Sequence, residues 1–162
     1  MTETKFRRLR RDELEEVRDQ FVKFLGVNGI DAGSWQRMKE DEPARADALI
    51  LQFSQLVFSG VLGRVEHLIE RRPTEIRSYR AGADKLELRG VRVVGPCSLD
   101  LTRTDVSPQD MLITLRSEGA KLQLYSAERP YRAAGRERDL YELMEAGALI
   151  DPTAFFGVLG QL

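Results

Sequence analysis

The stretch from Pro43 to about Glu70 constrains the fold more than any other, because its pattern predicts one long and unusually apolar helix. With successive residues placed 100° apart, its apolar side chains cover an arc of roughly 240°. That arc consists of Leu49, Ile50, Phe53, Leu56, Val57, Phe58, Val61, Leu62, Val65, Leu68 and Ile69. A helix on the surface of a domain needs an apolar stripe of little more than about 100°. The predicted central helix therefore requires cover on more than one side.

The sequence offers two ways to cover this helix. The rest of the chain can wrap around it, or part of the arc can face a second copy of the chain. Ser59, Gly60 and Gly63 share one flank and leave little side-chain bulk there, so another backbone can approach closely. Both arrangements are compatible with the pattern, and we expect Gly60, Gly63 and Arg64 at an interaction surface.

Arg64 interrupts the apolar arc near its middle. Because a buried guanidinium without a partner is very costly, this side chain has to be paired or has to reach water. Three interpretations remain open. The side chain extends to solvent from the helix end, it binds a small anion or carboxylate at the edge of the sheet, or it forms an ion pair across a dimer interface.

The whole chain predicts an α+β fold, in which N-terminal helices and the long central helix pack on an antiparallel meander sheet, with C-terminal helices. Residues 11–26 are amphipathic, and Ser34 is placed to cap a short helix. After the central helix, apolar residues alternate in short runs, which predicts four or five strands. These runs contain Ile76 and Tyr79, Leu86 and Leu88, Val91 to Val94, Leu99 and Leu101, Met111 to Leu115, and Leu122 and Leu124. Helices are expected again at 135–148 and after Asp151. Residues 1–10 are expected to form a flexible basic arm, and residues 11–162 a single α+β domain.

Residues for catalysis or metal binding are scarce. His67 is the only histidine and Cys97 the only cysteine. His67 and Glu70 would share a face of the predicted helix, but two ligands do not complete a metal site. Asp100, Asp105 and Asp110 do not match a calcium-binding loop, and no glycine-rich phosphate loop or nucleophile motif is present. We therefore predict no catalytic, cofactor-binding or metal-binding residue, and the sequence favours a non-enzymatic role.

The strongest charge feature is the segment Lys5 to Arg11, in which five of seven residues are basic. Its arginines, Arg7, Arg8, Arg10 and Arg11, are the candidate nucleic-acid contacts, because a short basic arm can bind phosphates. Further basic residues lie in the predicted sheet, namely Arg77, Arg80, Lys85, Arg89 and Arg92. However, the net charge is −1 and the aromatic residues of an RNA-binding sheet are missing, so nucleic-acid binding is an alternative that the sequence does not favour.

Several stretches resemble a family of short uncharacterised bacterial proteins, a domain of unknown function. They are Phe6 to Glu16, Phe21 to Leu25, Gly29 to Trp35 and Asp84 to Val93, within roughly the first 95 residues. The resemblance implies a small cytoplasmic protein. It transfers no cofactor and no functional residue.

These patterns predict a cytoplasmic interaction or scaffold protein that self-associates as a homodimer and binds an unidentified protein partner. Two alternatives are a nucleic-acid-associated protein that uses the basic arm, and a protein that binds a small anion or metabolite near Arg64. A membrane is not expected as a partner. The longest charge-free run, Ala48 to Gly63, is shorter than the ~20 residues of a spanning helix, and the first residues lack the apolar core of a signal peptide.

Overall fold

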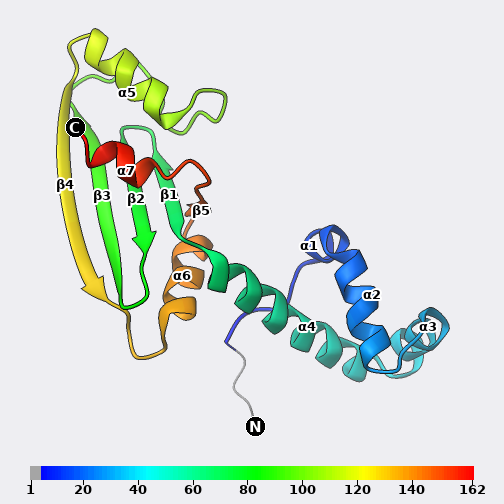
Figure 1. The fold of residues 1–162 in the computed structure, drawn as a ribbon. Helices are drawn as coiled ribbons and strands as arrows, with labels where there is room; N and C mark the ends of the chain where they lie inside the picture. Colours follow the sequence, from blue (N-terminus) through cyan, green and yellow to red (C-terminus); the bar gives the residue numbers. More distant parts are fainter. Residues whose placement is uncertain (1–4) are drawn as a thin grey trace. The chain divides into compact units, whose positions relative to one another are not determined.

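The computed structural model describes residues 5–162, and the chain divides after Gly63 into two compact units (Figure 1). Within the described residues, the first unit contains four helices, and the second contains an antiparallel sheet with three short helices. The predicted α+β class is therefore confirmed, with the N-terminal helices, the long helix and the C-terminal helices all present.

The first unit is built around its longest helix. Its elements are α1 (Arg11–Glu16), α2 (Arg18–Val27), α3 (Ala32–Asp41) and α4 (Pro43–Arg64). The helix predicted over 11–26 is thus interrupted at Val17, whose backbone leaves the helical region. The predicted Ser34 cap is wrong, because Asp31 caps α3 by accepting a 2.7 Å hydrogen bond from the Ser34 amide. An aspartate that precedes the first turn satisfies an otherwise unpaired amide and suits the positive end of the helix.

Aromatic side chains form the centre of the first unit. The ring of Phe21 lies 5.0 Å from that of Phe53 and 5.2 Å from that of Trp35, and Phe24 lies 5.3 Å from Phe53, measured between ring centroids. Around these rings the buried residues of the unit are Leu9, Leu25, Ile30, Met38, Ala46 and Ile50. One flank of α4 therefore belongs to a core that it shares with α2 and α3.

The central helix is shorter than its apolar pattern predicted. It ends at Arg64, and residues 67–72 form strand β1 instead of further helical turns. Leu68 and Ile69 are both buried, at 0% and 7% exposure. Because neighbouring residues of a strand point to opposite faces, both faces of the sheet are covered at this position. The physical reason is long-range pairing, because β1 forms ladders with β2 and β5 that a local helical period does not reveal.

The second unit is a five-stranded antiparallel sheet in the order β4-β3-β2-β1-β5. The strands are β1 (His67–Arg72), β2 (Glu75–Ala81), β3 (Lys85–Val94), β4 (Lys121–Pro130) and β5 (Leu149–Ile150). β1 to β4 follow one another across the sheet, whereas the short β5 returns to the far edge beside β1. The predicted meander is therefore confirmed for four strands.

Helices and loops complete the second unit. They include α5 (Pro108–Ser117), α6 (Arg136–Glu145) and α7 (Phe155–Leu159). The strand predicted over 111–115 is wrong, because Ser107 caps α5 with a 3.1 Å bond from the Asp110 amide and Pro108 occupies the first turn. The strand predicted at Leu99 and Leu101 is a loop, in which Leu101 is fully buried. The main core lies between the sheet and helices α5 and α7, and contains Ile76, Val91, Met111, Leu115, Phe155 and Leu159.

Candidate interaction site

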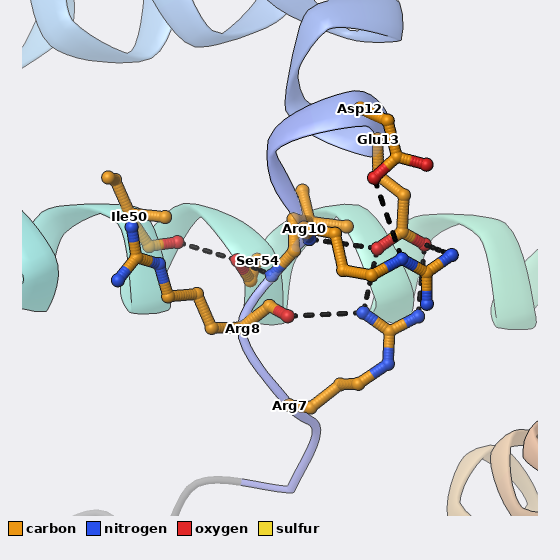
Figure 2. Close-up of polar contacts among 8 residues, drawn as sticks. Arg7, Arg8, Arg10, Asp12, Glu13, Ile50 and Ser54 are labelled. Atoms are coloured by element: carbon orange, nitrogen blue, oxygen red, sulfur yellow. Dashed lines mark hydrogen bonds and ion pairs between the residues drawn. The ribbon is translucent and has the colours of Figure 1, made fainter.

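Residues 5–10 lie extended along α4 and take their hydrogen bonds from two of its polar side chains. The Gln55 amide donates to the Phe6 carbonyl at 2.7 Å, and its oxygen accepts from the Phe6 and Lys5 amides at 2.9 and 3.0 Å. The Ser54 hydroxyl accepts from the Leu9 amide at 2.9 Å and donates to the Ile50 carbonyl at 2.7 Å (Figure 2). Gln55 and Ser54 thus supply hydrogen bonds to the extended backbone, as a neighbouring strand does in a sheet.

Two apolar side chains anchor the same segment. Phe6 and Leu9 are 5% and 6% exposed, and the Phe6 ring lies 5.6 Å from that of Phe58. Burying side chains of this size contributes about 1.5–3 kcal/mol each. Residues 1–4 of the predicted flexible arm lie outside the described residues, whereas residues 5–10 are packed against α4.

Glu13 binds two arginines of this segment, Arg7 and Arg10 (Figure 2). Arg7 binds its carboxylate through two bonds of 2.7 and 2.9 Å, and the Arg10 backbone amide donates to it at 2.8 Å. The hydrogen bond from Arg7, together with the Arg10 amide, outweighs the opposing effect of burial and lowers the Glu13 pKa to about 2. Arg8 pairs with Asp47 at 2.9 Å, and Arg10 lies 3.5 Å from Asp12.

The arginines predicted to contact nucleic acid therefore differ in their availability. Arg7, Arg8 and Arg10 are paired with the protein's own carboxylates. Arg11 forms no ion pair with any residue of the described range 5–162. A phosphate would have to displace existing partners at three of the four positions, which weakens the case for a nucleic-acid interface without testing it.

The basic residues of the sheet are also engaged. Arg77 and Arg92 bind the buried carboxylate of Glu75 at 3.2 and 3.3 Å, and the Tyr125 hydroxyl donates to it at 2.7 Å. Burial raises the pKa of Glu75, but the Tyr125 and Arg77 bonds prevail and leave it below its ordinary value. Tyr125 reaches Glu75 because its ring lies over Gly90, where a Cβ atom would fall 2.0 Å from the ring.

The remaining sheet cations have partners of their own. Arg80 pairs with Glu87, and Lys85 binds Glu128 at 2.8 Å. Arg89 donates to the Phe156 carbonyl at 2.9 Å and lies 4.0 Å from the centre of its ring. The basic residues of the sheet are therefore bound to other groups of the second unit.

The described residues contain no group of three or more histidine, cysteine or acidic side chains that could hold a metal ion. The predicted shared helix face of His67 and Glu70 is wrong, because both lie in β1, where an odd spacing places them on opposite faces. The Cys97 thiol contacts the Leu99 carbonyl in the loop after β3, and Asp105 pairs with Arg103. Cys97 and Asp105 therefore make contacts within their own loops.

Arg64 and Gly63 are exposed at the end of α4, and Gly60 is half-buried. Exposure of Arg64 fits the interpretation in which its side chain reaches water from the helix end. Hollows of about 350, 620 and 740 Å³ lie elsewhere, beside Arg71, Cys97 and Trp35, and Arg64 lines none of these three.

The outer flank of α4 is the part of this helix that the first unit leaves open. Ala48, Gln52, Leu56 and Gly63 are exposed on it, and Leu56 keeps 59% of its surface. Among the described residues, α4 is the one helix long and apolar enough to cross a membrane by length and composition, yet only 28% of that stretch is buried. This is weak evidence for a span, since the core helix of a soluble protein passes the same test.

Over residues 1–162 the chain matches the model of a family of unknown function (DUF6495), and it belongs to that family. The resemblance seen in the first 95 residues is thereby confirmed for an uncharacterised family and extends to the whole chain. No curated protein and no solved structure matches the chain.

Proposed function

We propose that this member of an uncharacterised family is a non-enzymatic scaffold protein that self-associates through the outer flank of α4. The observation that carries the proposal is the contrast between the apolar composition of α4 and the exposure of Leu56, which keeps 59% of its surface. An apolar helix surface left in water is unfavourable by about 25 cal/mol for each Å². A partner that covers Leu56 and its neighbours removes that cost.

A second copy of the chain fits this flank better than a bilayer does. Ser54 and Gln55 are committed to the backbone of residues 5–9, and Ile50 and Phe53 to the core with α2 and α3. Placing α4 across a bilayer would strip it of these partners and carry charged helices into hydrocarbon. A protein partner covers the outer flank and leaves the inner one intact.

The flank is also complementary to itself. Leu56 lies near the middle of the exposed row, between Ala48 and Gly63. In an antiparallel pair related by a two-fold axis, the Leu56 side chains of the two copies meet at the centre, and the small residues at both ends let the backbones approach. The row contains no charge between Asp47 and Arg64 that would oppose this contact.

Light scattering coupled to size exclusion, over a range of protein concentrations, tests self-association. We expect a dimeric mass for the natural sequence and a monomeric mass for Leu56→Glu with an unchanged circular dichroism spectrum. Ile113→Glu is the matched control, because Ile113 is also 59% exposed but lies on α5. A monomer at high concentration, or equal disruption by both variants, removes the proposal.

We further propose that the protein acts in the cytoplasm of a bacterial cell. A single cysteine, which cannot form an internal disulfide, and the family resemblance support this location. Cell fractionation provides the test: the protein is expected in the soluble fraction, and recovery in membranes resistant to high salt would point to α4 as an anchor.

A further inference from the structure

The hollow between α1–α2 and α3 has the composition of a binding groove. It encloses about 740 Å³, within the usual range for ligand sites, and lies entirely in the first unit. Its apolar lining includes Leu14, Phe21, Leu25, Ile30 and Trp35, and Val22 stands 59% exposed at its border. The groove thus offers an aromatic and aliphatic surface between two helical walls.

Three cations border this groove. Arg11 and Arg18 come from the α1–α2 wall, and Lys39 comes from α3. None of the three forms an ion pair with any described residue, in contrast to Arg7, Arg8 and Arg10 nearby in the sequence. The Lys39 ammonium lies 5.9 Å from the centre of the Trp35 ring, so charge and aromatic surface occur together.

Two carboxylates share the border, and neither forms an ion pair with these cations. Asp31 accepts the Ser34 amide at 2.7 Å as the cap of α3, which lowers its pKa. Glu15 is exposed and forms no ion pair within residues 5–162. The groove therefore combines an apolar floor with a border on which three cations outnumber two carboxylates.

We propose that this groove binds an amphipathic helix of a partner protein whose apolar side chains enter the groove and whose acidic flanks face Arg11, Arg18 and Lys39. The distribution of the charges favours a helix over a single anionic headgroup. Arg11, Arg18 and Lys39 come from three different helices, α1, α2 and α3, that border the groove. Acidic residues on successive turns of a bound helix can face cations spread along such a border.

Trp35 provides the readout, because it is the only tryptophan of the chain and lines the groove. The probe is a peptide of about 18 residues without aromatic residues, with leucine along one helical face and glutamate on its flanks. The control peptide carries lysine in place of every glutamate. We expect a saturable change of Trp35 fluorescence with the acidic peptide, at least about tenfold tighter than with the basic one.

Paired double variants locate the binding. R18E/K39E should weaken the acidic peptide by about tenfold or more, whereas K23E/R37E, which makes the same charge change on α2 and α3 outside the groove, should change binding less than about twofold. Equal effects of the two double variants, or equal affinity for both peptides, overturn the proposal. Binding to anionic phosphatidylglycerol vesicles without binding to the peptide also overturns it and assigns the groove to a membrane surface. The Leu56→Glu monomer should bind the peptide normally, so this test is independent of self-association.

Discussion

Both flanks of α4 carry a large apolar side chain, but the two side chains have opposite surroundings. On the inner flank, Phe53 is 4% exposed and lies against Phe21 and Phe24, while Ser54 and Gln55 hold the extended residues 5–9. On the outer flank, Leu56 is 59% exposed. The comparison teaches that apolar composition alone does not identify the core side of a helix, because the positions of the polar residues that bind a neighbouring backbone also mark it. Substitutions on the inner flank should therefore lower the stability of the single chain, whereas substitutions on the outer flank should mainly affect self-association.

Phe53→Ala should have the largest effect, a loss of about 3–5 kcal/mol in the free energy of unfolding. Removal of the Phe53 ring opens a cavity beside Phe21 and Phe24, which neighbouring helices cannot fill without moving. Chemical denaturation followed by circular dichroism measures this loss. A loss below about 1 kcal/mol would contradict the assignment of this flank to the core.

Gln55→Ala should destabilise the protein by about 1–3 kcal/mol, because it removes the hydrogen bonds that Gln55 makes with the amide and the carbonyl of Phe6. Gln52→Ala is the matched control on the same helix, since Gln52 is exposed on the outer flank. It should change stability by less than about 0.5 kcal/mol. Hydrogen exchange at the Phe6 amide should accelerate only in the Gln55 variant, and equal changes in both variants would remove the distinction between the flanks.

These roles show how far the sequence predicts the structure. Pro43 correctly marked the start of α4, but the apolar residues from Val65 onward satisfied both a helical and a strand pattern, so its end was misplaced. Strand β1 is selected by pairing with β2 and β5, and the partner residue of Leu68 in β5 is Ile150. In the same way, no local pattern predicts that Gln55 binds Phe6, because the two residues are 49 positions apart. The candidate arginines are adjacent in the sequence, but their pairing depends on the turn into α1 that brings Glu13 back to Arg7.

Acidification should weaken the attachment of residues 5–10, because it removes the ion pair between Arg7 and Glu13. Because the folded-state pKa of Glu13 is lowered from 4.5 to about 2, its stabilisation is fully present above about pH 4.5 and is lost as the pH falls from there towards 2. Arg7 and Glu13 retain 28% and 24% side-chain exposure, so solvent limits the contribution to about 1 kcal/mol. Glu13→Gln should reduce the pH dependence of unfolding in this window, whereas Asp12→Asn should retain it. An identical pH profile for Glu13→Gln and the natural sequence would show that this ion pair does not stabilise the segment.

Leu56→Ala should have the smallest effect on the stability of the isolated chain, less than about 0.5 kcal/mol, because most of the side chain is already in water. Denaturation at a protein concentration too low for self-association measures this intrinsic effect. At high concentration the same substitution should lower the unfolding midpoint relative to the natural sequence, because dimer formation stabilises the folded state by mass action. A concentration-independent loss of several kcal/mol would instead mean that Leu56 is buried within one chain. If the effect of Leu56→Ala on the unfolding midpoint grows with protein concentration, the outer flank of α4 is covered by a second copy of the chain. If it does not, the flank remains in water in the folded protein.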